Sequence, residues 1–225
     1  MPRLNKFIAE NLGISRRAAD LAIAEGQVYV NNHPAMLGAQ VNGQDKILFK
    51  GKPVAAVPRL YYLFYKPVGY LSSRRAQGSA PTLYTLLPPT LQALKTVGRL
   101  DRDSEGLLLL SNDGDFAFRL THPKFAKQKI YELKLDRPLT PQHQQLISSF
   151  GVTLKDGPSK LSLMSLDAQR LAWQVKMHEG RNRQIRRTFG ALGYHVNKLK
   201  RLSFGPFTLG KLKPGEYQKI TPKSF

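Results

Sequence analysis

The chain has 225 residues, of which 41% are hydrophobic. Its 35 lysines and arginines and 15 acidic residues give a formal charge of +20. This charge favours a polyanionic partner such as a nucleic acid over a membrane surface. No cysteine is present, so disulfides and thiolate zinc sites are excluded. The sequence has no run of about 20 apolar residues that could span a membrane and no apolar signal-peptide core near its start, so we expect a protein of the reducing cytoplasm.

The first segment of the chain is predicted to form two helices followed by a hairpin. Apolar residues repeat at helical spacing from Leu4 to Leu12. Ser15 can cap a second helix, which Gly26 would end. Alternating residues then predict short strands at 28–30 and 46–49.

Several basic side chains of this first segment lie outside its apolar stripe. They could form an ordinary solvated face, but in a chain with a charge of +20 an RNA-binding face is favoured. The candidate RNA-binding residues are Arg3, Lys6, Arg16 and Arg17.

The sequence pattern changes after residue 50. Two prolines and small residues at 51–58 are typical of a linker, which would separate a small domain at 1–50 from a larger one at 59–225. We expect modest contact between the two domains. In the larger domain, strands and helices mix in an irregular order, which predicts an α+β fold rather than a doubly wound sheet. Strands are predicted at 60–65, 107–111, 130–135, 161–166, 171–177 and 196–204, and helices at 116–120, 141–148 and 183–192.

The stretch GRLDRDSEGLLLLSNDGD, from Gly98 to Asp115, contains an unusual carboxylate. Asp101 stands between Arg99 and Arg102, shortly before a leucine run that reads as a buried strand. On spacing alone, a functional acid and an aspartate that merely stabilises a turn are equally favoured. The other acids nearby are interpreted as solvated or helix-capping, namely Asp103, Glu105 and Asp113.

A second basic segment, MHEGRNRQIRRTFGALGYHVNKLKR, spans residues 177–201. On the helix predicted at 183–192, the apolar residues share one face and most arginines point away from it. Such a band suits contact with RNA phosphates without sequence readout. We interpret Arg181, Arg183 and Arg187 as RNA-binding residues, in a band continued by Lys198, Lys200 and Arg201.

Arg186 differs from its neighbours because it falls on the flank of that helix, between core and surface. It could simply extend the basic face. A flank arginine can also reach a half-buried carboxylate, and we expect its guanidinium within about 4 Å of Asp101, the usual limit for an ion pair.

Tyr131 is predicted to lie in a strand beside Lys129. A strand tyrosine is most often a core residue with a satisfied hydroxyl, although it can also stack on a nucleobase. The five histidines show no metal-binding spacing, and the sequence contains no phosphate-binding glycine loop.

Together these motifs resemble a known family. GRLDRDSEGLLLLSNDGD resembles the catalytic signature of the RsuA-type bacterial pseudouridine synthases. YYLFYKPVGYLSS, KIY and EGRNRQIRR resemble three further family motifs, in the family's order. The N-terminal helices and GQVYVNNHPA resemble the small RNA-binding module shared with a ribosomal protein. The resemblance covers nearly the whole chain, and it implies a mixed, mainly antiparallel sheet.

The resemblance also implies a chemistry. A uridine already in RNA would have its N-glycosidic bond broken, its base turned, and the base rejoined through carbon 5, with no cofactor and no metal. Asp101 matches the essential catalytic aspartate, and Tyr131 the tyrosine that packs on the target uracil. Arg186 matches the residue that forms an ion pair with the aspartate, and Arg99 the arginine that holds the nucleotide flipped out.

The RNA substrate is less sharply indicated. Family members with the N-terminal module mostly modify ribosomal RNA, and EGRNRQIRR with GYHVNKLKR leans toward the large-subunit enzymes. Small-subunit ribosomal RNA and transfer RNA remain alternatives. A non-catalytic RNA-binding assembly factor is disfavoured, because it would be expected to lose Asp101 or its basic partner. We expect the protein to be a monomer.

Overall fold

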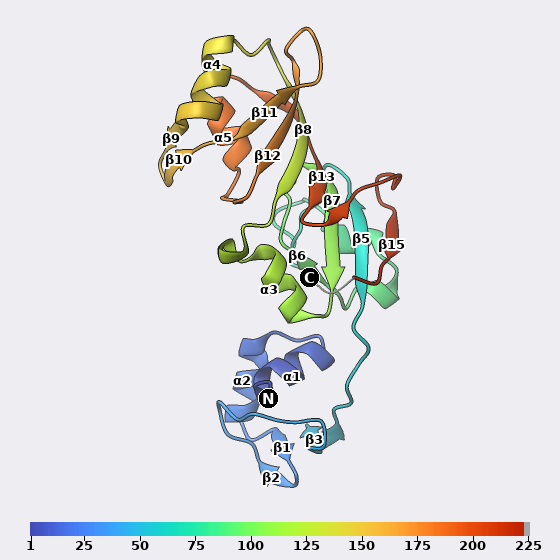
Figure 1. The fold of residues 1–225 in the computed structure, drawn as a ribbon. Coiled ribbons are helices and arrows are strands. Elements are labelled where there is room, and N and C mark those ends of the chain that lie inside the picture. The colour runs from blue at the N-terminus through green and yellow to red at the C-terminus, as the bar shows by residue number, and fades with distance from the viewer. Residues whose placement is uncertain (223–225) are drawn as a thin grey trace.

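In the computed structural model, which describes residues 1–222, the chain forms two bodies joined by one extended segment (Figure 1). The smaller body, called here the N-terminal module, packs two helices against an antiparallel sheet of order β2-β1-β3-β4. Its elements are α1 (Leu4–Asn11), α2 (Arg16–Ala24), β1 (Val28–Val30), β2 (His33–Pro34), β3 (Ile47–Phe49) and β4 (Lys52–Pro53).

The predicted helices and hairpin of the N-terminal module are present. The Ser15 hydroxyl accepts a 3.0 Å hydrogen bond from the backbone N–H of Ala18 and so caps α2, as the sequence predicted. The apolar faces of the helices pack on the sheet, where Leu4, Ile8 and Val28 are fully buried.

The connection between the two bodies is shorter than the predicted linker at 51–58. Strand β4 pairs with β3, and the next residue, Val54, is buried in the core of the module. The first part of that segment therefore belongs to the N-terminal module. Composition alone could not reveal this, because a two-residue strand is held by backbone pairing rather than by a side-chain pattern.

The larger body, called here the C-terminal body, is built on a nine-stranded sheet of order β11-β12-β8-β13-β7-β5-β15, with β14 paired to β13 and β6 to β7. The pairing is antiparallel except between β13 and β7. The predicted α+β fold with a mainly antiparallel sheet is thus confirmed. The strands are β5 (Tyr61–Lys66), β6 (Lys95–Val97), β7 (Glu105–Ser111), β8 (Lys129–Leu135), β11 (Ser162–Ser165), β12 (Ala172–Met177), β13 (Val196–Phe204), β14 (Phe207–Thr208) and β15 (Tyr217–Lys219).

Both faces of this sheet are covered, which explains the uninterrupted leucine run of β7. Leu108 and Leu110 pack in the cluster that includes α5, whereas Leu107 and Leu109 pack against α3. All four leucines are fully buried. The helices are α3 (Gly114–Thr121), α4 (Pro141–Gln145) and α5 (Gln184–Gly190), with a π-helical turn at Leu146–Phe150 and 3₁₀ turns at Leu83–Leu86, Pro89–Leu91 and Pro123–Phe125.

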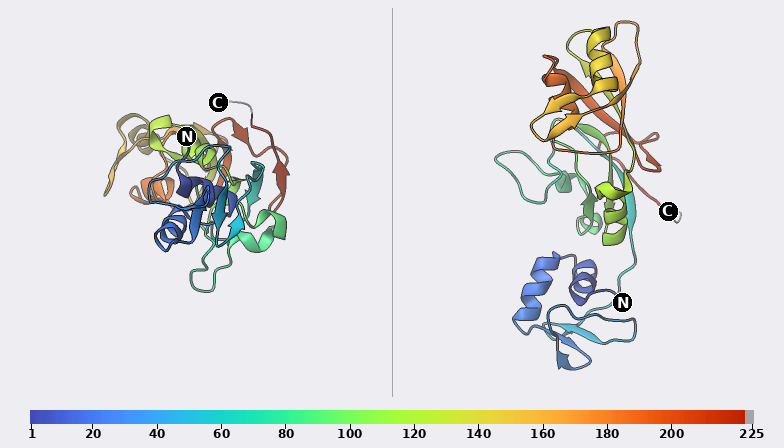
Figure 2. Two further views of the ribbon diagram at one scale, coloured as in Figure 1. Left: turned by 90° about the horizontal axis from the view of Figure 1, so that it is seen from below. Right: turned by 60° about the vertical axis from the view of Figure 1, so that its left-hand side comes forward.

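Several short strands were not predicted from the sequence. Besides β4, β6, β14 and β15, these include a separate hairpin formed by β9 (Val152–Leu154) and β10 (Gly157–Ser159), which lies beside α5 at the end of the body away from the N-terminal module (Figures 1 and 2). No helix within residues 1–222 is long and apolar enough to cross a membrane.

The N-terminal module lies near α3 of the C-terminal body (Figure 1), and a few polar contacts join the two bodies. Lys6 Nζ lies 2.5 Å from Asp115 Oδ2, and the Gly114 N–H donates to Glu10 Oε1 at 3.3 Å. Lys6 therefore faces the C-terminal body, which corrects its predicted place on an RNA-binding face. Its helical position was read correctly, but the acid that pairs with it lies 109 residues away in sequence.

Candidate active site

Asp101 lies in a loop that is fixed at both sides by backbone contacts. The Ser72 hydroxyl donates to the Leu100 carbonyl at 2.8 Å and accepts from the Leu100 N–H at 3.1 Å. Lys66 Nζ donates to the Ser104 carbonyl at 2.7 Å. Burial lowers the pKa of Lys66 to about 8. These contacts hold the backbone around Asp101 without engaging its carboxylate.

Gly106 lets β13 approach β7 immediately after this loop. Its φ is +107°, and a Cβ built there would lie 2.3 Å from the Arg201 carbonyl oxygen. The register pairs Gly106 with Arg201 and Glu105 with Lys200, after which the two parallel strands diverge. The cleft opens beside this point.

The cleft has a volume of about 450 Å³ and is walled by the Asp101 loop, the end of α3, strand β8 and the loop at 178–183. The Asp101 side chain is 32% exposed there. The sequence-predicted residues that line the cleft are Arg99, Asp101, Tyr131, Arg181 and Arg183. The fold thus brings together residues that are up to 84 positions apart in sequence.

Arg183 is the arginine closest to the Asp101 carboxylate. Its Nη1 lies 3.8 Å from Asp101 Oδ2, and its guanidinium forms a bidentate pair with Asp103 at 2.9 and 2.8 Å. These hydrogen bonds hold the pKa of Asp103 below its usual value. Asp103 is therefore a structural ion-pair partner rather than the solvated acid that the sequence predicted.

The predicted ion pair between Arg186 and Asp101 is wrong. Arg186 Nε lies 3.2 Å from Asp103 Oδ2, and its terminal nitrogens donate to the carbonyls of Val196 and Asp103. The reason lies at the start of α5, which begins one residue later than predicted. Arg183 precedes the helix in a left-handed conformation, with φ +45°, and this turns its side chain toward the acids.

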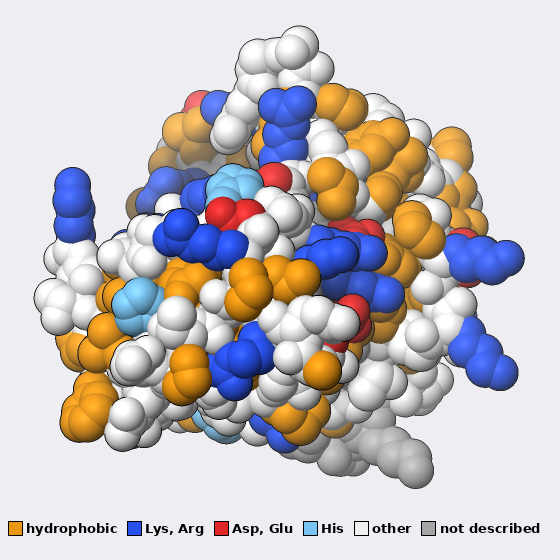
Figure 3. Space-filling view, turned by 90° about the horizontal axis from the view of Figure 1, so that it is seen from above, with side chains coloured by type: hydrophobic (Ala, Val, Ile, Leu, Met, Phe, Trp, Pro, Cys, Tyr) orange, Lys and Arg blue, Asp and Glu red, His pale blue; other side chains and the backbone are white. Residues whose placement is uncertain are grey.

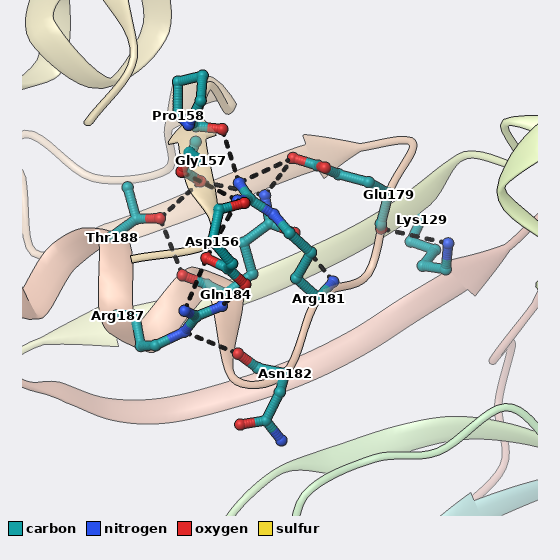
Figure 4. A network of polar contacts seen from close by, with 11 residues as sticks. Lys129, Asp156, Gly157, Pro158, Glu179, Arg181, Asn182, Gln184, Arg187 and Thr188 are labelled. Atoms are coloured by element: carbon teal, nitrogen blue, oxygen red, sulfur yellow. Dashed lines mark hydrogen bonds and ion pairs between the residues drawn. The ribbon is translucent and has the colours of Figure 1, made fainter. Parts of the chain in front are cut away.

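Arg181 and Arg187, which were predicted to bind RNA, are both hydrogen-bonded to the β9–β10 hairpin (Figure 4). Arg181 donates to the carbonyls of Asp156, Gly157 and Pro158 at 2.9, 3.0 and 2.7 Å. Arg187 forms a bidentate pair with the Asp156 carboxylate at 2.8 and 2.7 Å. These hydrogen bonds fix the loop that carries Arg183 to the hairpin.

Tyr131 belongs to the core and to the cleft at once. It is 8% exposed and packs in the main apolar cluster, yet it also lines the cleft that contains Asp101. Arg99 is exposed and lines the cleft. Arg3, Arg16 and Arg17 are exposed on the N-terminal module. Seen from above, the C-terminal body presents Lys and Arg side chains among apolar ones, with Asp and Glu less prominent (Figure 3). Within residues 1–222, no group of three or more His, Asp or Glu side chains is arranged to hold a metal ion.

The comparison with known families agrees with this geometry. A family model described as RNA pseudouridylate synthase matches residues 60–191, which include Asp101, Tyr131 and Arg183. The chain belongs to the RNA pseudouridylate synthase family. A model described as S4 domain matches residues 2–47, the N-terminal module of this synthase.

Full-length relatives support the assignment. This pseudouridylate synthase is 38% identical to a protein of Bacillus subtilis named ribosomal large subunit pseudouridine synthase B, over 99% of this chain and 93% of the relative. It is 36% identical to a ribosomal small subunit pseudouridine synthase A of Pasteurella multocida, over 97% and 96%. A crystal structure of a pseudouridylate synthase, 32% identical, superposes with a TM-score of 0.70 over 98% of this chain and 96% of that one. The resemblance seen in the sequence motifs is confirmed.

Several residues at this site were missed by sequence reasoning. Lys66 was given no role of its own, whereas it is buried and donates to the Ser104 carbonyl in the Asp101 loop. Arg201 was read as part of an exposed basic band, whereas it is 2% exposed and lines the cleft. The spacing of Arg201 at the end of an alternating strand gave a signal for burial, but the lysines around it obscured that signal.

The two interpretations of Tyr131 can be separated by substitution. Tyr131→Phe keeps the ring and should fold and retain most activity. Tyr131→Ala should lose activity by far more than RNA affinity, because stacking acts on the target base alone, and about 1 to 3 kcal/mol is typical for one stacked base. Thermal unfolding, RNA affinity and pseudouridine formation measure the three effects. Equal losses of stability in both variants, with activity retained, would identify Tyr131 as a core residue only.

Proposed function

We propose that this synthase converts a uridine of ribosomal RNA to pseudouridine with Asp101 as the catalytic carboxylate. The observation that carries the proposal is the position of Asp101, whose carboxylate opens into the cleft with a guanidinium 3.8 Å away. A carboxylate can act as a nucleophile or as a base.

The shape of the cleft suits a nucleotide that has left its stack. Enzymes that act on a base within RNA turn that nucleotide out into a pocket, and about 450 Å³ is within the range of small-ligand sites. In this proposal Tyr131 packs on the uracil, exposed Arg99 holds the flipped nucleotide at the rim, and Arg183 and Arg186 hold the acids in place. Arg186 acts through Asp103 rather than on Asp101 directly.

The RNA substrate in this proposal is the large-subunit ribosomal RNA. The EGRNRQIRR segment and the Bacillus subtilis relative named for the large subunit support it. The Pasteurella multocida relative is named for the small subunit and is nearly as similar. The first experiment should therefore determine which RNA is modified.

The test uses purified full-length protein with unmodified transcripts of both ribosomal RNAs and a set of transfer RNAs. Pseudouridine is located by chemical labelling and mass spectrometry. We expect one modified uridine, in the large-subunit transcript. A site in the small-subunit RNA or in a transfer RNA would overturn the substrate assignment. Tight RNA binding with no pseudouridine in any transcript would overturn the enzymatic proposal and favour an assembly factor.

The N-terminal module should contribute affinity through exposed cations. Replacing both Arg16 and Arg17 with alanine should flatten the dependence of RNA affinity on salt by about 0.7 to 0.9 log units per log of salt for each phosphate interaction that the substitution removes. The rate at saturating RNA should stay unchanged, because Arg16 and Arg17 lie on α2 of the N-terminal module and do not line the cleft. Lys6→Ala is the control, since Lys6 is paired with Asp115 and should leave the slope as it is. An unaltered slope in the double variant would remove Arg16 and Arg17 from the interface.

A further inference from the structure

Arg201 is a buried arginine without an acidic partner. It is 2% exposed, and none of the ion pairs formed within residues 1–222 includes it. Buried charges in proteins are normally paired, because taking a charge out of water is costly. A buried arginine without a partner beside a substrate cleft indicates that the substrate supplies the partner.

The Arg201 side chain is held in place but not saturated. Its Nε donates to the Leu107 carbonyl at 2.7 Å, and its guanidinium carbon lies 5.0 Å from the centre of the Phe204 ring. Its Nη2 is buried and has no hydrogen-bond partner. A buried donor without an acceptor is rare in native proteins. The contacts with Leu107 and Phe204 fix the orientation of the Arg201 side chain, and its Nη2 remains available to donate to a ligand.

The strand register puts Arg201 next to Tyr131. Arg201 is directly opposite Tyr131 across β13 and β8, and directly opposite Gly106 across β13 and β7. Residues opposite one another on neighbouring strands point to the same face of a sheet. Arg201 and Tyr131 both line the cleft, and Gly106 carries no side chain to separate Arg201 from the Asp101 loop.

The neighbouring cations are already committed. Lys129 Nζ donates to the carbonyls of Lys127, His178 and Glu179 at 3.3 to 3.4 Å. Burial, together with the nearby charge of Arg201, lowers the pKa of Lys129 to about 8. Lys66 is engaged by the Ser104 carbonyl. Unlike these two lysines, Arg201 keeps a buried terminal nitrogen, Nη2, without a partner, so it retains donor capacity for a ligand.

The proposed reaction creates an anion that needs such a donor. Conversion of uridine to pseudouridine breaks the N1–C1′ bond and forms a C5–C1′ bond, and the proton lost from C5 is matched by one gained at N1. If the N1–C1′ pair stays with the base, the detached uracil is an anion with charge on O2 and O4. If a carboxylate instead adds to C6, charge again moves to O4. Fixed donors aimed at developing charge lower the barrier in either case.

We propose that Arg201 donates to a carbonyl oxygen of the target uracil and stabilises the negative charge that the base acquires during the reaction. This inference rests on the proposed function of the cleft. An RNA phosphate is the less suitable ligand, because the phosphates of a flipped nucleotide stay at the rim, where exposed Arg99 can reach them. The base is the part of the nucleotide that enters the cleft as far as Tyr131.

The first experiment replaces Arg201 in the full-length protein with glutamine and with lysine. Single-turnover pseudouridine formation at saturating RNA should fall by about 10² to 10³-fold for Arg201→Gln, the scale seen when one oxyanion donor is removed. RNA affinity should change little. Arg201→Lys keeps the positive charge but lacks the planar guanidinium, so its rate should lie between those of the wild type and Arg201→Gln.

The matched control is Arg170→Gln. Arg170 also donates from Nε to a carbonyl, that of Leu139 at 2.6 Å, and lies 5.1 Å from an aromatic ring centre, that of Trp173. It does not line the cleft. Arg170→Gln should lower the unfolding temperature while the folded protein keeps its rate, so the comparison separates packing from chemistry.

The second experiment tests the uracil contact with sulfur substitution in the RNA. RNA carrying 2-thiouridine or 4-thiouridine at the target weakens one carbonyl acceptor at a time. One of the two thio-substitutions should slow the wild-type enzyme by a larger factor than it slows the Arg201→Gln enzyme. The variant lacks the donor of the hydrogen bond that the sulfur weakens, so it has less to lose. Arg201→Lys provides the same comparison if Arg201→Gln does not fold.

The outcomes are distinct. A folded Arg201→Gln enzyme with full rate, or equal effects of both thio-substitutions in wild type and variant, would overturn this inference alone. Weakened RNA affinity with an unchanged saturating rate would identify Arg201 as a phosphate anchor and also overturn it. A wild-type protein that forms no pseudouridine in any RNA would overturn the proposed function, and this inference with it.

Discussion

Asp101→Asn is expected to abolish pseudouridine formation and to leave folding and RNA binding nearly unchanged. The loop around Asp101 is held through Leu100, Ser72 and Lys66, and none of these contacts uses the Asp101 carboxylate. An asparagine of the same shape therefore fits the loop. Its amide is neutral and is neither a nucleophile nor a base at neutral pH, so the rate should fall by at least about 10⁴-fold, the scale of removing an essential side chain.

Asp103→Asn is the matched control for this substitution. Asp103 lies two residues away and pairs with Arg183 and Arg186, so its variant should lose stability and only part of the rate. Pseudouridine is quantified by mass spectrometry of digested RNA, and binding by filter retention. An Asp101→Asn protein that is active, and is shown not to have deamidated back to aspartate, would refute the catalytic assignment.

Gly106→Ala should have the largest effect on stability. The new Cβ would lie 2.3 Å from the Arg201 oxygen and 2.6 Å from the Arg201 nitrogen, and both atoms belong to a central strand that cannot move aside. The positive φ adds strain of about 1 to 2 kcal/mol. Together we expect a loss of about 3 to 5 kcal/mol in the free energy of unfolding, or failure to fold.

Gly69→Ala separates the two contributions to that loss. Gly69 has a similar φ of +94°, but a Cβ there would meet nothing within 4 Å. Its variant should lose about 1 to 2 kcal/mol from backbone strain alone. Urea unfolding followed by circular dichroism measures both variants. Equal losses in the two would show that the close approach of β13 to β7 is not the constraint described above.

Local signals were sufficient for elements whose stability is local. Asp113 and Thr140 cap α3 and α4 as their residue types indicate, in each case by accepting a hydrogen bond from a backbone N–H of the first turn. The β9–β10 hairpin has no such signal. It is held by Asp156 to arginines more than 20 residues away, and sequence spacing carries no record of that contact.

The candidate site shows the same division. Motif resemblance found Asp101 and Tyr131, but their partners depend on backbone details. A single residue in left-handed conformation at the start of α5 decides that Arg183, and not Arg186, approaches Asp101. Arg201 and Lys66 resembled surface cations because their burial is produced by neighbouring strands rather than by apolar residues beside them in sequence.

The position of β13 has a consequence for biosynthesis. The Asp101 loop, which leads into β7, and strand β8 both wall the cleft. Strands β7 and β8 are not neighbours in the sheet, because β13 lies between them. A nascent chain that ends before residue 196 therefore lacks the strand that brings the Asp101 loop, at the start of β7, next to Tyr131 on β8. Pairing over such sequence separations is slow to form. The cleft is assembled only when nearly the whole chain has left the ribosome, so a growing chain cannot act on the ribosomal RNA beside it.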